Sequence, residues 1–363
     1  MEQRKYEAKT HTLYDNSLND SRFHVLLFIL RLAGIPLNKN YRKRDIEHLL
    51  SLTDSFTWEE LPTRDPDTGH LTNAGYIPII QSLTKYTVVF GLAGHAIQSA
   101  VRIVMSHDMI FTTWFPIDAS SSPLYEIVIL IQVVASIFTA SLHFGFPGLY
   151  ATLACIAGSQ LEKLRAALLD IRHTHRISVH DCEEETDERE AAGRKNDPSE
   201  SFRRMQQQLN NCIRHHQEIK RYMAALEDTM HLPLWGLFLL IFLDICFDAF
   251  SAVMIWAHHA DIAQAAYVYA MLLGVTYIYC WFGDRLSQQA ESVRDAAWGI
   301  DWVGTPVPFQ RSVCFIIAAA NKEFTLTAGK FVPVCNSTMM NVSKFTISCN
   351  NNTFRVRKRL LTQ

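Results

Sequence analysis

The stretch IVILIQVVASIFTASLHFGFPGLYATLACIAG, residues Ile127 to Gly158, decides the fold class, because it holds no Asp, Glu, Lys or Arg. It exceeds the roughly 20 apolar residues that a bilayer-spanning helix needs. Further apolar runs of sufficient length are Lys85–Met105, Leu232–Trp256 and Ala265–Gly283. A buried helix of a soluble enzyme is the alternative for any one run. Four runs in one chain predict an all-α, polytopic membrane helical bundle.

The composition of the 363 residues agrees with a membrane protein and argues against several other classes. Charged residues make up 19%, below the roughly 25% of soluble globular chains. The formal net charge of −2 argues against a general nucleic-acid-binding surface. The sequence contains no C-x-x-C pair and no G-x-S-x-G, H-E-x-x-H, P-loop or G-x-G-x-x-G motif. We therefore expect neither an enzyme nor a resident cofactor or metal.

The charges of the connecting segments predict one orientation in the membrane. Residues 106–126 and 257–264 contain no Lys or Arg, whereas residues 159–231 carry twelve. Because Lys and Arg favour the cytoplasmic side, the charge-free loops are placed outside. The N terminus, residues 159–231 and the segment after Gly283 are placed in the cytoplasm.

The cytoplasmic stretch 159–231 has two parts of different character. Residues 181–200 hold nine acidic and three basic residues and no large apolar side chain, which predicts a disordered insert, either a solvated loop or a regulatory segment. After it, side chains recur at spacings of four and three and predict a helix of about seven turns: Met205, Leu209, Cys212, His216, Ile219, Met223, Leu226 and Met230. This seam faces either the same chain or another subunit, and in the second case Asp at Leu209 and Leu226 would weaken association.

Two groups of polar residues invite a chemical interpretation. Asp244 and Asp248 lie four residues apart in an apolar run, so they share one helical face and should point to the bundle interior or to water. They form an ion or ligand site, or are satisfied by neighbouring polar groups. His258, His259 and Asp261 have the composition of a metal site, but adjacent histidines on a helix point apart, and we predict no metal there.

Several longer stretches resemble the insect odorant receptor family. The first is FTTWFPIDASSSPLYEIVILIQ, residues 111 to 132, and the second is IRHHQEIKRYMAALEDTMHLPLWGLFLLIFLDIC, residues 213 to 246. The third runs from Tyr277 to Val334 and contains C-x-x-G-D, S-V-x-x-A-A-W and T-A-G-K-F. The resemblance covers about residues 83 to 334. The family's gustatory relatives are the nearest alternative, but the T-Y-x-x-x-x-x-Q-F signature usual for them is not present.

The resemblance implies a tuning subunit of a ligand-gated cation channel with seven helices and a cytoplasmic N terminus. It also implies assembly with a shared co-receptor as a heterotetramer, a volatile small-molecule ligand, and the plasma membrane of a sensory neuron dendrite. The outer half of the bundle would supply the ligand contacts, each of which has core packing as its alternative: His95, Gln98, Tyr125, Phe138, Phe250, Tyr267 and Met271. Trp114 is included because Trp114, Phe115, Pro116 and Asp118 match the family's outer-loop motif.

Both ends of the chain depart from the family pattern. Residues 1–82 form a predicted cytoplasmic region with a short lead helix at Phe23–Leu37, and one or two early membrane helices are expected to be missing before Lys85. Residues 83–334 are the receptor-like membrane domain, and residues 335–363 are an atypical polar tail that is too polar to span and replaces the pore helix. This interpretation predicts that the chain adds no current of its own.

The runner-up function is therefore a nonconducting or defective assembly partner of the same family. A G-protein-coupled receptor is disfavoured because the predicted orientation is inverted and no D-R-Y or N-P-x-x-Y motif is present. A transporter is disfavoured because the sequence shows no internal repeat.

Overall fold

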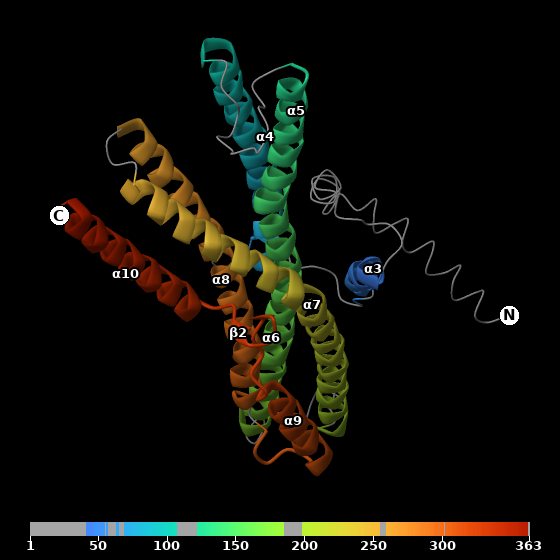
Figure 1. Ribbon diagram of the computed structural model, residues 1–363. Coiled ribbons are helices and arrows are strands. Elements are labelled where there is room, and N and C mark those ends of the chain that lie inside the picture. Colours follow the sequence, from blue (N-terminus) through green and yellow to red (C-terminus); the bar gives the residue numbers. More distant parts are fainter. Residues whose placement is uncertain are drawn as a thin grey trace. The chain divides into compact units, whose positions relative to one another are not determined.

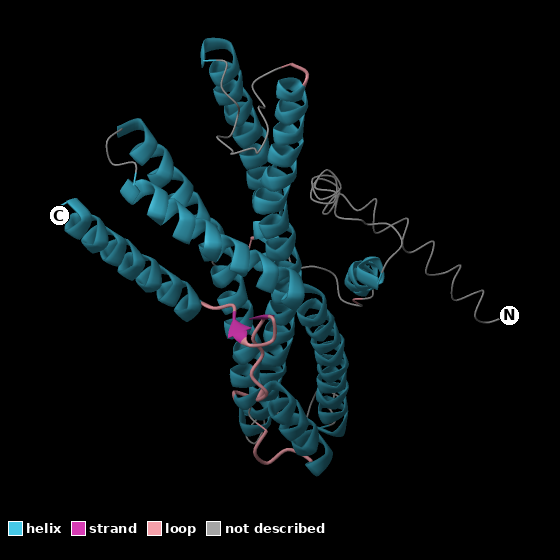
Figure 2. Ribbon diagram, in the orientation of Figure 1, coloured by secondary structure: helices cyan, strands magenta, loops and turns pink. Residues whose placement is uncertain are grey.

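The computed structural model describes residues 41–54, 56, 63–64, 69–106, 122–184, 198–254, 259–300 and 302–361, and these are almost entirely helical (Figures 1 and 2). The chain divides into two compact units. The first contains residues 1–51 and 76–152, and the second contains residues 52–75 and 153–363. The helical architecture confirms the predicted all-α class.

The first unit contains the long apolar helices nearest the N terminus. Helix α4 (Asn73–Ser106) enters it at Tyr76, and α5 (Leu124–Ala140) continues through a π-helical turn, η1 (Ser141–Gly145), into α6 (Phe146–Glu184). The predicted span Ile127–Gly158 is thus one helical course with a π-helical turn inside it. Helix α3 (Tyr41–Asp54) precedes them and is mostly polar.

Helix α4 begins twelve residues before the apolar run Lys85–Met105 that predicted it. The cause is a buried stripe at helical spacing, Ile77, Ile80, Thr84 and Val88, which is too mixed in polarity to register as a span. The predicted lead helix at Phe23–Leu37 falls outside the described residues.

The second unit is built around α7 (Pro198–Met254), a helix of 57 residues. It packs against α8 (His259–Trp298), α9 (Val307–Ala320), α10 (Asn336–Leu361) and the strand β1 (Thr327–Ala328), which pairs antiparallel with β2 (Val332–Pro333). Figure 1 shows α9 beside the N-terminal part of α7, at the opposite end of the unit from the C terminus of α10.

The predicted seam of α7 is buried within this one chain. Leu209, Ile219 and Leu226 are completely buried, and the other five seam residues, including His216, are at most 6% exposed. Tyr222 beside them donates a hydrogen bond to the Leu153 carbonyl of α6. Of the two interpretations, packing within the same chain is the one the structure supports.

Two described helices are long and apolar enough to cross a membrane, Leu124–Ile171 and Phe202–Phe247. In the second helix the apolar window lies after His231, because the earlier turns carry Arg and Lys side chains. The chain itself buries only 18% and 28% of the apolar 18-residue stretches in these two helices. Such large exposed apolar surfaces are favourable in lipid and costly in water, so both helices are candidates for crossing a membrane.

The predicted disordered insert, residues 181–200, is helical at both edges. Helix α6 continues to Glu184 and α7 begins at Pro198. Proline is favoured in the first helical turn, and Glu200 places a negative charge near the positive end of α7. Residues 185–197 fall outside the described residues.

The segment predicted as an atypical polar tail forms α10, a helix of 26 residues. Its packed side chains recur at helical spacing, with Met339 and Val342 partly buried and Thr346 2% exposed. The average polarity of the tail conceals this stripe, and for that reason the sequence did not predict the helix.

Candidate functional site

The inner end of α10, the hairpin and α7 meet at a junction that we call the hairpin junction: Glu227 to His231 of α7, Thr327 to Pro333, and Cys335 with Asn336. The hairpin pairs Thr327 with Pro333 and Ala328 with Val332. Its turn needs positive φ at Gly329 (68°) and Lys330 (67°). A Cβ on Gly329 would lie 2.8 Å from the Trp235 ring and 2.6 Å from the Phe331 ring. Conformation and space therefore both require glycine in the T-A-G-K-F motif.

The hairpin is bound to a single turn of α7 by four polar contacts. Thr327 donates its backbone N–H to Glu227 Oε2 at 2.9 Å and its hydroxyl to Glu227 Oε1. The Gly329 N–H donates to the His231 carbonyl at 2.8 Å. On the exposed side, Lys330 forms an ion pair with Asp228 at 3.1 Å. The half-buried bonds to Glu227 hold the strand, and the exposed ion pair contributes less.

The hairpin leads directly into α10. The Cys335 carbonyl accepts the N–H groups of Thr338 and Met339, and Asn336 donates to Asp284 of α8 at 2.7 Å. Burial raises the pKa of the Cys335 thiol, but hydrogen bonds from Ser337 and Thr338 outweigh it and lower that pKa below its ordinary value. Further along α10, the Phe345 ring packs on Phe242 of α7 with centroids 5.0 Å apart.

A polar cluster joins the start of α4 to α6 and α8. Glu162 accepts the Asn73 backbone N–H at 3.1 Å and the Gln289 amide at 2.9 Å. Arg285 donates to the Asn73 side chain at 3.1 Å and lies 5.3 Å from the centre of the Trp281 ring. Arg285 directly follows the C-x-x-G-D motif, so the cluster lies next to that motif on α8.

Gly158 makes this close approach possible. A Cβ there would overlap the Gln289 amide oxygen and lie 3.0 Å from Asn73 Nδ2. We predict that Gly158→Ala destabilises the protein by about 1–3 kcal/mol through overpacking. Gly274→Ala in α8 is the control, because nothing lies within 4 Å of a Cβ added at that position; it should be neutral or stabilising by up to about 1 kcal/mol. Thermal unfolding in detergent measures both, and equal melting temperatures would contradict the prediction.

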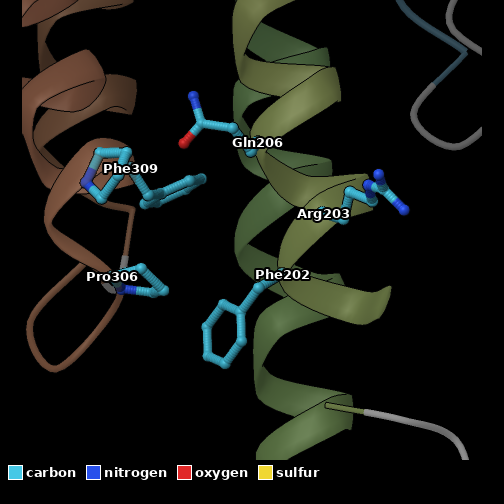
Figure 3. A pocket seen from close by; sticks show the side chains of 6 residues that line it. Phe202, Arg203, Gln206, Pro306 and Phe309 are labelled. Atoms are coloured by element: carbon cyan, nitrogen blue, oxygen red, sulfur yellow. The ribbon is translucent and has the colours of Figure 1, made fainter. Parts of the chain in front are cut away.

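Two cavities lie between α7 and α9, in the part of the chain predicted to be cytoplasmic. The larger, about 380 Å³, is lined by Phe202, Arg203, Gln206, Pro306, Pro308 and Phe309. In Figure 3, Phe202 and Gln206 project toward Pro306 and Phe309, whereas the Arg203 side chain points away. The second, about 240 Å³, includes His216, Lys220 and Phe315. Neither cavity includes a predicted ligand-contact residue.

The predicted ligand-contact residues are only partly described. Tyr125 and Phe138 on α5 and Met271 on α8 have described side chains, whereas His95, Gln98, Phe250, Tyr267 and Trp114 do not. Tyr125 and Phe138 are 13 residues apart on one helix, or about 20 Å along its axis. One small ligand would therefore contact at most one of the two.

The intramembrane carboxylates and the histidine pair add no defined site. The Asp244 side chain is exposed, while the side chains of Asp248, His258, His259 and Asp261 fall outside the described residues. Among the side chains that are described, no group of three or more His, Cys, Asp or Glu could hold a metal ion.

Comparison with known proteins places the chain in a family. The sequence profile described as "7tm Odorant receptor" matches residues 36–347. Odorant receptor 2a of Drosophila melanogaster is 24% identical over 257 residues, and Odorant receptor 83a of the same species is 23% identical over 263. These matches cover 69% and 64% of this chain but 61% and 56% of the relatives, so the chain spans about three fifths of their length.

A solved structure shares the fold. The insect olfactory receptor OR5 from Machilis hrabei, in complex with eugenol, aligns with a TM-score of 0.59, covering 97% of this chain and 98% of that one at 14% identity. The chain belongs to the odorant receptor family, whose members are membrane receptors of olfaction. The family match continues 13 residues beyond Val334, into the first half of α10.

Proposed function

We propose that this protein is an odorant-sensing subunit of a heteromeric, ligand-gated cation channel in the plasma membrane of sensory neuron dendrites. It assembles with a shared co-receptor as a tetramer and takes a volatile small molecule as ligand. The observation that carries the proposal is α10, because a conducting subunit needs a last helix that packs on protein with one face and meets water with the other.

Helix α10 has these two faces. Met339, Val342 and Thr346 are partly or fully buried, whereas polar side chains at spacings of four, three and four are exposed: Ser337, Asn341, Lys344 and Ser348. By helical spacing, the exposed apolar side chains of Met340, Phe345 and Ile347 flank this polar stripe. Its 26 residues correspond to about 39 Å, more than the roughly 30 Å hydrocarbon thickness. The exposed stripe is too polar for lipid, but it suits a water-filled path shared with other subunits.

The proposed ligand site lies in the outer half of the membrane helices, among the contact residues named above. With the predicted orientation, α5 begins at the outer surface, so Tyr125 lies near the surface and Phe138 about 20 Å deeper. A pocket in the outer half therefore favours Tyr125 over Phe138 as a ligand contact. Asp244 and Asp248 are proposed to face polar surroundings within the assembly.

A nonconducting assembly partner is the second candidate, and the end of α10 favours it. The run CNNNTFRVRKRLL, residues 349 to 361, combines three asparagines with four basic residues, and such a sequence is costly at membrane depth. If this half of α10 stays out of the membrane, the subunit assembles but lines no path for ions.

Whole-cell recording separates the two candidates. The chain, an odorant co-receptor, or both are expressed in cells that lack odorant receptors, and a panel of volatiles is applied. We expect the pair to respond to odorants that do not activate the co-receptor alone, and the chain alone to give no current. Co-purification of the two proteins with a response profile equal to that of the co-receptor alone would favour the nonconducting partner.

The proposed orientation gives a separate prediction. Epitope tags at the N terminus and after Ala192 should bind antibody only after permeabilisation, because the flanking segments are rich in Lys and Arg. A tag after Ser121 should bind on intact cells. Antibody binding to the Ala192 tag on intact cells would overturn the orientation.

A further inference from the structure

The hairpin junction connects two helices in a way that allows force to pass between them. Only Val334 and Cys335 separate β2 from α10, and two residues span at most about 7 Å. Val334 N–H also donates to the Leu326 carbonyl at 2.8 Å, which closes the base of the hairpin. A displacement of the hairpin must therefore displace the first turn of α10.

The hairpin is attached to α7 directly before a weak point in that helix. Pro233 lies inside α7, and a proline has no N–H to donate to the carbonyl four residues earlier, here that of Thr229. The residues of α7 that hold the hairpin, Glu227 and His231, lie on either side of Thr229 and before Pro233. A bend of α7 at Pro233 changes the direction of the apolar segment relative to the turn that holds the hairpin.

We propose that the hairpin is a coupling latch, in which Glu227 of α7 holds Thr327 and so fixes the inner end of α10 to α7. Bending of α7 then reaches α10 through this contact, and Glu227 is the positioning residue. The proposal rests on the proposed channel function, because it assigns to the latch the step between ligand binding and movement of α10.

The first measurement tests the latch without depending on channel activity. Cys335 lies at the end of the latch, and its half-buried thiol becomes more accessible when the hairpin detaches. Full-length protein in permeabilised membranes is treated with N-ethylmaleimide, and alkylation of the Cys335 peptide is followed by mass spectrometry. Glu227→Ala should accelerate this alkylation at least about tenfold. This factor corresponds to a loss of about 1.4 kcal/mol in the free energy that holds the hairpin on α7.

The matched control is Asp228→Ala, which removes the neighbouring carboxylate and its exposed ion pair with Lys330. Because exposed pairs contribute little, its rate should stay within about twofold of wild type. Thr327→Val removes only the hydroxyl donor and should accelerate alkylation by a smaller factor, so it replaces Glu227→Ala if that variant does not fold. Equal rates in wild type, Glu227→Ala and Thr327→Val, or equal acceleration by Asp228→Ala, would overturn the latch.

The second measurement tests coupling in cells that also express the co-receptor. At equal surface expression, Glu227→Ala should reduce the maximal odorant-evoked current to about a tenth, with Asp228→Ala close to wild type. If Glu227→Ala accelerates alkylation but leaves the odorant-evoked current unchanged, the coupling role is overturned, and the contact only holds the hairpin in place. If the wild-type pair gives no odorant-evoked current, the channel function fails, and the alkylation rates still decide whether the latch exists.

Discussion

Leu226→Asp should abolish folded protein instead of only weakening association with another subunit. Leu226 is completely buried in the seam of α7 by residues of the same chain. Losing a buried leucine costs about 2–5 kcal/mol, and burying an unpaired carboxylate adds several more. Together these terms approach the whole stability of a typical domain, about 5–15 kcal/mol.

Fluorescence-detected size-exclusion chromatography of a tagged chain in detergent measures this effect. We expect the monodisperse peak to disappear for Leu226→Asp and for Leu209→Asp, which replaces another fully buried residue. Ala224→Asp is the control on the same helix, because Ala224 is exposed and the change should cost less than about 1 kcal/mol. A normal peak for Leu226→Asp, together with lost co-receptor binding, would show that the seam faces a partner.

Acidification from pH 7.5 to pH 5 should destabilise the cytoplasmic half of α7. Burial, with smaller contributions from Lys163 and His216, lowers the pKa of His215 to about 4. Burial and Lys220 lower the pKa of His216 to about 4. An interaction with the Gln160 backbone raises the pKa of His215, but it does not outweigh burial.

The sign of the effect follows from the direction of the shifts. Unfolded histidine has a pKa near 6.5, so between about pH 6.5 and pH 4 the unfolded chain binds more protons than the folded one. The free energy of unfolding keeps its full value above about pH 6.5. It falls as the pH drops, by about 2 kcal/mol per histidine at pH 5.

Melting temperatures across this pH range provide the test. A double variant, His215→Gln with His216→Leu, should flatten the pH dependence, because neither replacement titrates there. His70→Gln is the control, since His70 is exposed. A double variant that melts with the same pH dependence as wild type would assign acid sensitivity to other groups.

The sequence predicts those features whose signals are local. The seam of α7 follows from a spacing of three and four, and the membrane class follows from uninterrupted apolar runs. The C-x-x-G-D and T-A-G-K-F motifs lie at or next to residues that join the helices, but the sequence alone did not reveal their contacts. Spacing within one helix is enough for such predictions, because the helical period alone places the residues on one face.

Other features depend on partners that are distant in the sequence. Glu162 is 89 residues from Asn73 and 127 from Gln289, and Thr327 is 100 residues from Glu227. No local pattern identifies such pairs. Helix α10 escaped prediction for another reason, because its buried stripe is masked by the exposed Asn341 and Lys344 in any average over the segment.

The central claim is that α10 lines an odorant-gated path for cations in a complex with the co-receptor. The most direct measurement is the Ca²⁺-to-Na⁺ permeability ratio of the odorant-evoked current for wild type, Lys344→Glu and the control Lys322→Glu. Lys344 is on the exposed face of α10, and Lys322 is exposed beyond the end of α9. Lys344→Glu should raise the ratio, because it replaces a repelling charge with an attracting one, and Lys322→Glu should leave it unchanged. An odorant-evoked current whose permeability ratio is the same in all three proteins would contradict the claim.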